Sequence, residues 1–483
     1  MPTSRIRSGV ALSVAVTALS AACSSATAPT SRTSASFVPT AAQTAFLDTV
    51  QRRTFDWFWE TTNTANGLVP DRWPTKSFSS IAAVGFGLTS YLVGVEHGWI
   101  SRDQARDRVL ATLRFFWTAP QSADANNVTG YRGFYYHFLD MERGVRFEKV
   151  ELSTIDSGLL LMGVLACRQY FDRADPGDST VRALADSIYF RADWPWALSG
   201  GASLSMGWHP ESGFITSRWI GYDEAMLLYA LALGSPTHPI GADAWQAWTR
   251  GYRWDSFHGQ QYVMFGPLFG HQYSHVWIDF RGIQDEYMRS RGIDYFENSR
   301  RATLAHRAYA VANPAAWRGY ADSVWGLTAS DGPLDSAFAL AGRQRQFHTY
   351  WARGAGSDEI NDDGTIAPTA AGGSIPFAPE ITIPALVAMR RQYGDALFGR
   401  YGFVDAFNPS LTDAALHVSQ GRIVQGLGWF DNDHLGIDQG PILLMIENHR
   451  SELVWRLLRA NPHIARGLCR AGFSGGWLAG RCS

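Results

Sequence analysis

From about residue 41 onward, apolar residues recur at helical spacing along most of the chain. One class of predicted helix is amphipathic, as in "SRDQARDRVLATLRFFW", which places Val109, Leu113 and Phe116 on one face. This segment opens with Ser101 and Gln104 at the spacing of a capping box. The segments "VRALADSIYF" and "SELVWRLLRA" belong to the same class. Helices of this class are expected to keep one face in water.

A second class of predicted helix is apolar on every side. It comprises "IAAVGFGLTSYLVGV", "SGLLLMGVLAC", "AMLLYALAL" and "PILLMI". A helix without a polar face is surrounded by protein. Residues 77–95 are uncharged over a length that raises the question of a membrane span, but their many Ser, Gly and Thr residues favour a buried helix. Alternating enclosed and half-exposed helices predict an all-α fold, a closed double ring with inner helices packed against outer ones.

The predicted helices are joined by long loops rich in Gly, Pro and Trp, such as "DWPWALSGGASLSMGWHPESGF". Short alternating stretches in these loops are expected to pair locally as strands, and loops of this length are often functional. No internal repeat and no linker is present after residue 40. We therefore expect residues 41–483 to form a single domain.

The N-terminus has the pattern of an export signal. Arg5 and Arg7 precede the apolar run "GVALSVAVTALSAA", and small residues lead to Cys23. "LSAAC" resembles a bacterial lipoprotein box, although Ser20 rather than Leu19 stands three residues before the cysteine. We expect residues 1–22 to be a signal peptide, Cys23 to be lipidated, and residues 23–40 to be a Ser/Thr/Ala/Pro tether. The protein would then be periplasmic or anchored in the outer membrane.

Composition narrows the classes of function. The chain is 46% hydrophobic and 18% charged, so it reads as globular rather than disordered. It has 42 basic and 44 acidic residues and no long run of one sign, which argues against a nucleic-acid binder and favours a neutral substrate. Its 19 Trp, 18 Tyr and 27 Phe suit core packing for the most part, and some would stack on sugar rings. We expect a monomer.

The four cysteines show no CxxC metal spacing. Cys167 lies inside an apolar helical segment, whereas Cys469 and Cys482 stand near the C-terminus. In an oxidising compartment the last two would be able to form a disulfide, but sequence alone does not fix their geometry.

Three of the enclosed helices carry a carboxylate at or just before the N-terminal end of the apolar run: Asp156, Glu224 and Asp438. The simplest interpretation is helix capping, because acids favour the positive end of the helix dipole. Together, however, the starts of alternate inner helices would bring their carboxylates into one cavity. Paired carboxylates are what glycosidic cleavage requires, one as proton donor and one to activate water. No GxSxG elbow or HExxH motif offers a competing chemistry.

The stretch "HQYSHVWIDFRGIQDEY" combines potential metal ligands with aromatic residues. The potential ligands are His271, His275, Asp279 and Asp285. Tyr273, Trp277 and Arg281 interleave with them, and this mixture favours a polar, aromatic sugar groove over a metal site.

Five segments resemble the bacterial β-1,2-glucanases of glycoside hydrolase family 144: "YRGFYYHFLDMERG", "ELSTIDSGLLLMGVL", "WIGYDEAMLLYALALGSP", "HQYSHVWIDFRG" and "LGIDQGPILLMIEN". The resemblance spans residues 44–468 in one order. It implies an (α/α)6 barrel, hydrolysis of linear β-1,2-glucan with inversion, and no metal or other cofactor. It also matches Glu224 and Asp438 to catalytic acids and Asp156 to another cavity acid. The sequence departs from the family pattern in "GYDEA", where Asp223 stands beside Glu224.

We expect nine residues in and beside these motifs to contact substrate: Asp140, Glu151, Trp219, Tyr222, Tyr273, His275, Trp277, Asp279 and Trp429. Glu224 is our predicted acid, because its enclosed helix would desolvate it and raise its pKa. Asp438 is our predicted base, because the polar turn residues before it would keep it charged. The alternatives are a glycan-binding lipoprotein without hydrolytic activity, a transglycosylase, and an exo-acting glucosidase, including one that acts on α-glucans.

Overall fold

The computed structural model describes residues 37–482, and residues Pro39–Ser483 group into one compact unit. The predicted signal peptide, Cys23 and almost all of the predicted tether lie outside the described residues.

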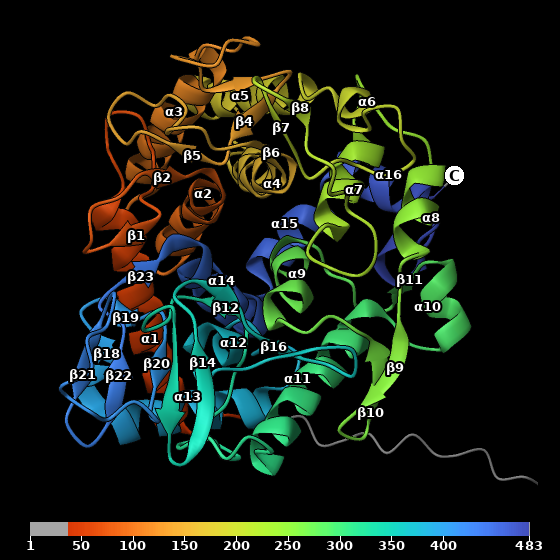
Figure 1. The fold of residues 1–483 in the computed structure, drawn as a ribbon. Coiled ribbons are helices and arrows are strands. Elements are labelled where there is room, and N and C mark those ends of the chain that lie inside the picture. The colour runs from red at the N-terminus through yellow and green to blue at the C-terminus, as the bar shows by residue number, and fades with distance from the viewer. Residues whose placement is uncertain (1–36, 483) are drawn as a thin grey trace, which may run out of the picture. The chain divides into compact units, whose positions relative to one another are not determined.

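The described chain is predominantly helical (Figure 1). Six helices are buried over all or most of their length: α2 (Ile81–Glu96), α4 (Thr154–Tyr170), α7 (Met226–Gly234), α9 (Tyr273–Trp277), α12 (Pro368–Gly372) and α14 (Gly436–Ser451). The others are α1 (Ala41–Thr61), α3 (Arg102–Thr118), α5 (Pro176–Phe190), α6 (Trp194–Ala197), α8 (Asp243–Thr249), α10 (Glu286–Arg291), α11 (Tyr295–Ala312), α13 (Pro379–Tyr393), α15 (Leu453–Arg459) and α16 (Pro462–Arg470), with the 3-10 turns η1 (Leu268–His271), η2 (Gly394–Ala396) and η3 (Gly476–Leu478).

The buried helices pack on one another and the amphipathic helices cover them. α2 packs against α4 and α14, α4 against α7, and α14 against α9 and α12. Around them α1 covers α14, α3 covers α2, α5 covers α4, α16 covers α7 and α13 covers α12. Figure 1 shows α2, α4, α9 and α14 near the middle of this unit, with α3, α5 and α13 farther out. Both classes of helix predicted from polarity are therefore present.

The close contact between α2 and α4 depends on two glycines. A Cβ at Gly85 would collide with the backbone of α4, and one at Gly163 would collide with the backbone of α2. Fourteen residues of α2 are buried by this packing and by α14, so residues 81–96 form the buried helix expected from their composition. Within residues 37–482, no helix combines the length and the apolar character needed to span a membrane.

Short strands occupy the long loops, and every strand pair within residues 37–482 is antiparallel. The largest sheet has the order β3-β4-β6-β7-β8, and a second has the order β20-β22-β21. The strands are β1 (Arg72–Trp73), β2 (Ser79–Ser80), β3 (Gly130–Tyr131), β4 (Phe134–Tyr136), β5 (Phe138–Leu139), β6 (Leu152–Ser153), β7 (Gly207–His209), β8 (Gly213–Phe214), β9 (Trp254–Phe257), β10 (Gln260–Val263), β11 (Ile283–Gln284), β12 (Ala329–Ser330), β13 (Ser336–Leu340), β14 (Arg343–Phe347), β15 (Trp351–Ala352), β16 (Gly354–Ala355), β17 (Ile360–Asn361), β18 (Phe398–Gly399), β19 (Gly402–Phe403), β20 (Phe407–Asn408), β21 (Arg422–Val424), β22 (Gly428–Phe430), β23 (His434–Leu435) and β24 (Ser474–Gly475).

Three of the buried helices begin directly after a paired strand. β2 leads into α2, β6 into α4 and β23 into α14, and each strand is held by a partner: β5, β4 and β1 respectively. Because the strand pairing fixes where each helix starts, it also fixes the side chains of the first helical turn. This is how the fold positions Asp156 and Asp438.

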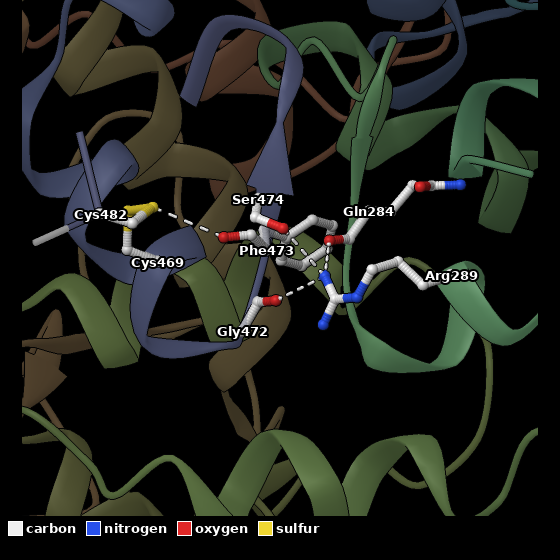
Figure 2. The surroundings of a disulfide bond; sticks show 7 residues. All are labelled: Gln284, Arg289, Cys469, Gly472, Phe473, Ser474 and Cys482. Atoms are coloured by element: carbon white, nitrogen blue, oxygen red, sulfur yellow. Dashed lines mark hydrogen bonds between the residues drawn. A yellow bond between two sulfur atoms is a disulfide. The ribbon is translucent and has the colours of Figure 1, made fainter. Parts of the chain in front are cut away.

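The C-terminal tail is attached to the helical unit at two places (Figure 2). Cys469 of α16 is disulfide-bonded to Cys482, with their Cα atoms 5.2 Å apart, which confirms the pairing that the sequence left open. Between them, β24 pairs with β11, and the guanidinium of Arg289 donates to the carbonyl oxygens of Gln284 and Gly472. Cys167 is a free, buried thiol in α4.

Candidate active site

The three acids singled out in the sequence all stand at the N-terminal ends of buried helices. Asp156 lies in the first turn of α4, Asp438 in the first turn of α14, and Glu224 two residues before α7. None of them is an N-cap. The cap of α4 is Ser153, whose hydroxyl accepts the amide of Asp156, and the starts of α7 and α14 have no side-chain cap. None of these carboxylates caps its helix, but Asp156 and Asp438 lie in the first turn, where an acid favours the helix dipole.

Asp223 and Glu224 are adjacent but have different surroundings. Asp223 Oδ1 accepts the Ala225 amide at 2.9 Å and the Trp248 indole N–H at 3.3 Å, so this carboxyl shapes the entry into α7. The carboxylate of Glu224 receives no side-chain hydrogen bond from the described residues. Burial raises the pKa of Glu224 well above its usual range, and the charges of Asp223 and Asp156 raise it further. Burial raises the pKa of Asp223 as well, to about 7, so what separates the two neighbours is that Asp223 is held by the Ala225 amide and the Trp248 indole.

Asp438 is buried more deeply than its sequence context indicated. It is 2% exposed, and within the described residues neither carboxylate oxygen accepts a hydrogen bond from an N–H or hydroxyl group. Burial raises its pKa to about 8, the charges of Asp331 and Asp71 add to this, and a hydrogen bond with Asp405 opposes it. The polar turn residues before Asp438 do not keep it in water, because β23 and α14 carry it into the interior.

Asp405 is the neighbouring carboxyl that offsets the raised pKa of Asp438. Burial raises its pKa well above the usual range, and so do the charges of Asp438 and Asp331. The hydrogen bond between the two carboxyls favours the proton on Asp405 and the charge on Asp438. Two buried carboxyls whose pKa values are both raised in this way share one proton more readily than both ionise.

A cluster of carboxyls surrounds the pair of Asp405 and Asp438. Oxygens of Asp331, Asp405 and Asp431 lie within 4.8 Å of one another, and all three residues are buried. The guanidinium of Arg72 donates to Asp331 Oδ2 at 2.7 Å and to Asp71 Oδ2 at 3.2 Å. Because one guanidinium does not balance all these acids, burial and mutual repulsion raise the pKa values of Asp405 and Asp431. Protons can therefore take up part of the negative charge.

His137 joins the other two carboxylates of the site. Its Nδ1 lies 2.7 Å from Glu151 Oε1, and its Nε2 lies 3.5 Å from Asp156 Oδ1. Burial alone would lower the pKa of His137, but Asp156 and Glu151 outweigh it and raise the pKa to about 9. The Ser153 hydroxyl donates to Asp156 Oδ2 at 2.5 Å. Asp156 is thus an oriented, hydrogen-bonded carboxylate beside an imidazolium.

Tyr273 connects the two halves of the site. It is 4% exposed, and burial raises its pKa well above the usual range, followed by the charges of Asp438, Tyr350, Glu224 and Asp405. Its phenol therefore lies within electrostatic reach of both predicted catalytic acids. Tyr350 is 52% exposed. Burial of its phenol, followed by the charges of Asp438 and Asp405, raises the pKa of Tyr350 well above the usual range.

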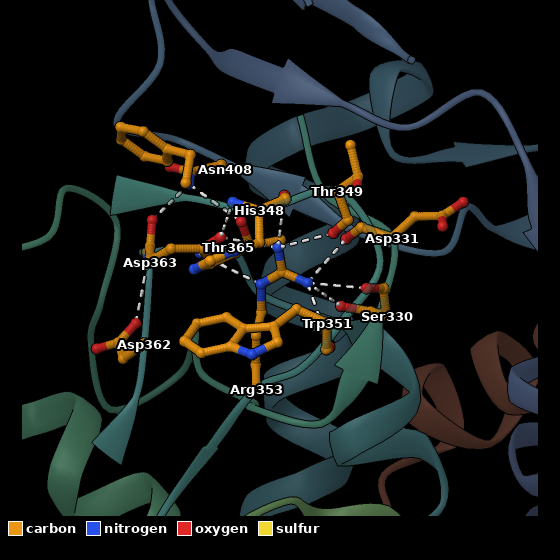
Figure 3. Close-up of polar contacts among 12 residues, drawn as sticks. Ser330, Asp331, His348, Thr349, Trp351, Arg353, Asp362, Asp363, Thr365 and Asn408 are labelled. Carbon is orange, nitrogen blue, oxygen red and sulfur yellow. Dashed lines mark hydrogen bonds and ion pairs between the residues drawn. The ribbon is translucent and has the colours of Figure 1, made fainter. Parts of the chain in front are cut away.

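A buried arginine fixes the loop that carries Asp331 (Figure 3). The guanidinium of Arg353 makes two parallel hydrogen bonds to Asp363, of 2.7 and 2.8 Å. It also donates to the backbone carbonyls of Ser330 and Asp331, at 2.8 and 3.3 Å. The Asp331 amide in turn donates to Asp405 Oδ2 at 2.8 Å. Arg353 thereby positions the backbone that orients Asp405.

Four of the predicted substrate contacts are buried in the structure. The Trp277 indole donates to Thr89 Oγ1 at 3.0 Å, and the Trp429 indole donates to the Gln420 carbonyl at 2.7 Å. The residues in question are His275, Trp277, Asp279 and Trp429, each at most 3% exposed. His275 pairs with Ser299, and Asp279 is held by Arg281 and Arg459. The expectation of substrate contact is corrected for these four: His275 and Trp277 lie in the part of α9 packed on α14 and α15, Asp279 is enclosed by Arg281 and Arg459, and Trp429 by β20 and β21.

Three other predicted substrate contacts, Trp219, Tyr222 and Asp140, each have different surroundings. Trp219 is 6% exposed, and its indole donates to Thr154 Oγ1 at the start of α4. Tyr222 is buried in an aromatic cluster with His271 and Tyr295. Asp140 is partly buried and lines a cavity beside the carboxyl cluster.

His271 and Asp285, the first and last of the four potential metal ligands noted in the sequence, also have structural partners. His271 Nε2 lies 3.1 Å from the Phe265 carbonyl oxygen. Asp285 caps α10 by accepting the Met288 amide, and it also accepts the Tyr295 hydroxyl at 2.9 Å. These contacts tie both residues to their own surroundings.

Sequence reasoning missed several residues of the site: Asp71, Arg72, His137, Asp331, Tyr350 and Asp405. Asp405 had a usable signal, because "GFVDAFN" sets one acid in an apolar run, and charged residues are almost never fully buried unless paired. Asp71 and Arg72 stand in the short motif "VPDRW". The others gave no local signal, because contacts between distant segments create their environment.

The chain is similar to several known proteins. A family model described as "Putative glucoamylase" matches residues 216–462. A solved structure of a putative glucoamylase from Bacteroides uniformis is 30% identical, with 90% of this chain and 99% of that chain covered and a TM-score of 0.77. An endo-β-1,2-glucanase from Chitinophaga pinensis, solved with sophorotriose and glucose, is 27% identical, with 90% and 99% covered and a TM-score of 0.76.

A curated relative, an exo-β-1,2-glucooligosaccharide sophorohydrolase (non-reducing end) from Parabacteroides distasonis, is 27% identical over 87% of this chain. The chain spans 57% of the length of that relative. One identification follows from three findings: the family match, the coverage of solved relatives from end to end, and the converging carboxyls. The chain is a glycoside hydrolase that belongs to the glucoamylase-like family and, within it, to glycoside hydrolase family 144.

Proposed function

We propose that this protein hydrolyses β-1,2-linked glucan with inversion, using Glu224 as the proton donor and Asp438 as the base. Both the Chitinophaga pinensis and the Parabacteroides distasonis relatives are named for action on β-1,2-linked glucose. The observation that carries the proposal is the place of α9 between the two acids: the Ser274 hydroxyl donates to the Glu224 carbonyl at 2.7 Å, and α9 packs on α14, which carries Asp438. Two carboxyls facing one space, one protonated and one ionised, are the requirement of an inverting glycosidase.

The directions of the pKa shifts of these acids support the proposed roles. Glu224 has its pKa raised well above the usual range, so it enters the reaction protonated and can protonate the oxygen of the leaving sugar. Asp438 accepts a proton from the attacking water, directly or through an intervening hydroxyl. Asp405 keeps the shared proton and supports the charge on Asp438. His137 holds Asp156 in place beside Glu224.

We propose an (α/α)6 barrel as the architecture behind this site. The six buried helices would form the inner ring, and α1, α3, α5, α11, α13 and α16 would provide the outer one. The packing of α14, α2, α4 and α7 in sequence, each covered by an amphipathic helix, supports this arrangement. Structures of an endo-β-1,2-glucanase from Talaromyces funiculosus, 12–13% identical, share the fold at a TM-score of 0.59.

The test is product analysis on linear β-1,2-, β-1,3- and α-1,4-glucans, with NMR of the first products formed. We expect cleavage of β-1,2-glucan alone, with new reducing ends in the α configuration, because inversion converts the β linkage. Cleavage of α-1,4-glucan, or products that retain the β configuration, would refute the proposal. A product series made only of disaccharide would indicate exo action, as in the sophorohydrolase, and transfer products would indicate a transglycosylase.

We further propose that the protein is exported and anchored through lipidated Cys23, which rests on the sequence pattern of residues 1–23 alone. Expressed in a bacterial host, the protein should fractionate with membranes, and Cys23→Ser should release it. Recovery of all the wild-type protein in the soluble fraction would contradict the anchor.

A further inference from the structure

A cavity of about 630 Å³ lies between α16 and the C-terminal tail, beside the disulfide shown in Figure 2. Its lining contains three arginines and no acidic residue. These arginines are accompanied by the cap of α16 and by both cysteines: Asn461, Arg466, Cys469, Arg470, Arg481 and Cys482. None of the carboxyls of the candidate active site is in the lining, so this cavity is separate from the proposed catalytic centre.

The sequence that forms this cavity is basic, although the chain as a whole is not. After Glu452 the chain contains five arginines and no Asp or Glu. The whole chain, in contrast, has 42 basic and 44 acidic residues. The positive charge of the C-terminal segment is therefore not balanced by acids within that segment.

Two of the three arginines stand one turn apart on α16 and bind the end of α7. Arg466 Nε donates to the Gly234 carbonyl oxygen at 3.0 Å, and Arg470 Nη1 donates to that of Leu233 at 3.0 Å. The end of a helix carries only about half an elementary negative charge. Capping α7 therefore uses some N–H groups of both guanidiniums and leaves most of their positive charge uncompensated.

Arg481 brings a third positive charge to the same place. Its Nη1 donates to the Arg459 carbonyl oxygen at 2.5 Å, and the disulfide between Cys482 and Cys469 ties this part of the tail to α16. Among residues 37–482, none of the three arginines in the lining forms an ion pair, whereas Arg459 pairs with Asp279. Like charges around one concavity repel one another, and an anion bound among them removes that repulsion.

The start of α16 adds to the positive side of the cavity. Asn461 Oδ1 accepts the amides of His463 and Ile464 at 2.9 and 3.2 Å, so the side chain caps this nine-residue helix. Its Nδ2 is buried and has no acceptor in the part of the chain that the structure describes. A helix N-terminus favours an anion, because its dipole is positive there. The side chains of the lining thus offer a ligand positive charge and N–H donors.

These features match a phosphate group better than they match a carboxylate. A guanidinium binds two oxygens of a phosphate through parallel hydrogen bonds, and a phosphate has enough oxygens to accept from more than one arginine. A volume of about 630 Å³ is in the range of small-molecule sites, so the cavity has room for the group that carries the phosphate.

We propose that this cavity binds a phosphate group, free or carried by a lipid headgroup, through Arg466 and Arg481, and that the disulfide between Cys469 and Cys482 holds Arg481 in the site. The proposal does not depend on the proposed function. The cavity lies beside the C-terminal end of α7, whereas Glu224 precedes the N-terminal end of that helix, so a bound phosphate leaves the catalytic acids free.

Calorimetric titration with inorganic phosphate at low ionic strength tests the site, because salt screens exposed charges. We expect wild-type protein to bind one phosphate. Arg466→Gln and Arg481→Gln should each raise the Kd by about 10-fold, because hydrogen bonds to charged groups contribute binding energy of that order. Arg470 is left unchanged, since it also borders a second cavity that contains Glu286. The matched control, Arg391→Gln, removes an exposed arginine of α13 and should leave the Kd unchanged.

The role of the disulfide has its own variant. Cys482→Ser should raise the Kd for phosphate as much as Arg481→Gln does, and combining the two substitutions should raise it no further. Thermal melts of each variant show whether the fold is kept. Arg481→Gln is the variant least expected to disturb it, because the only hydrogen bond of Arg481 within residues 37–482 is to the Arg459 carbonyl. Wild-type affinity of Cys482→Ser would overturn the role of the disulfide.

A second arm distinguishes the sources of phosphate. Cys23→Ser protein, which has no lipid anchor, is sedimented with phosphatidylglycerol vesicles. Binding that Arg481→Gln weakens assigns the site to a lipid headgroup, and phosphate binding without vesicle binding assigns it to a soluble phosphate compound. If wild-type protein does not bind phosphate, or if Arg466→Gln, Arg481→Gln and Arg391→Gln all bind it equally well, the proposal is overturned, whatever the activity on glucans.

Discussion

Arg353 and Asp363 form a bidentate ion pair, and neither side chain is more than 1% exposed. The pair lies at the base of the loop that carries Asp331 and Tyr350, and its guanidinium also holds the backbone carbonyls of Ser330 and Asp331. Because burial removes the competition of water, this ion pair links the stability of the fold directly to the geometry of the carboxyl cluster.

Asp363→Asn should therefore destabilise the protein by about 3–5 kcal/mol, since it leaves the Arg353 charge buried without its partner. Chemical denaturation monitored by fluorescence measures this. The control is Asp56→Asn, which removes the partly exposed i,i+4 partner of the exposed Arg52 and should cost no more than about 0.5 kcal/mol. Equal effects of the two substitutions would show that Arg353 does not depend on Asp363.

Glu224→Gln and Asp438→Asn should each lower turnover by about 10²–10⁴-fold, because each removes a titrating group of the proposed reaction and nearly preserves shape. Asp438→Asn should also keep or raise the melting temperature, because it removes a charge from a buried group of acids. Kinetics on β-1,2-glucan and thermal melts test both statements. Near-wild-type turnover of either variant would remove that residue from its role, and Asp156 or Glu151 would be the next candidate.

Tyr273→Phe should lower kcat by about 10²-fold while the ring keeps its packing, because it removes a donor between the two acids. Steady-state kinetics and a thermal melt measure the two effects. The matched control is Tyr262→Phe, which removes a buried hydroxyl that has no partner in the described residues. That control should leave turnover unchanged and stability equal or higher. Equal turnover of the two variants would contradict the role of Tyr273.

His137 predicts a pH dependence of stability. Its pKa in the folded protein is about 9, above the ordinary 6.5, so the folded state binds this proton more tightly than the unfolded state. The stabilisation is complete below pH 6.5 and is lost as the pH rises toward 9. Over this range the unfolding free energy of wild type should fall, and His137→Gln should flatten that slope. The exposed control, His417→Gln, should leave it unchanged, and an identical slope in both variants would contradict the assignment.

The periodicity of apolar residues determined the two classes of helix. The capping box at Ser101 and Gln104 is formed as the spacing predicts, and residues 81–96 form a buried helix. These features are local, because the side chains involved lie within a few residues of one another along the chain. The same reasoning placed Asp156 and Asp438 at helix starts, since each stands at the beginning of an apolar run, and both lie in the first turn of their helices.

Tertiary structure alone decided the electrostatics of the site. Asp438 follows polar turn residues in the sequence, yet the fold packs it against Asp405 and Asp331 from other loops, so its pKa rises instead of staying low. Trp429 stands in a polar stretch, yet β20 and β21 enclose it. Desolvation and Coulomb interaction depend on distance in space, and distance in space between segments tens or hundreds of residues apart is set only when the helices and loops pack.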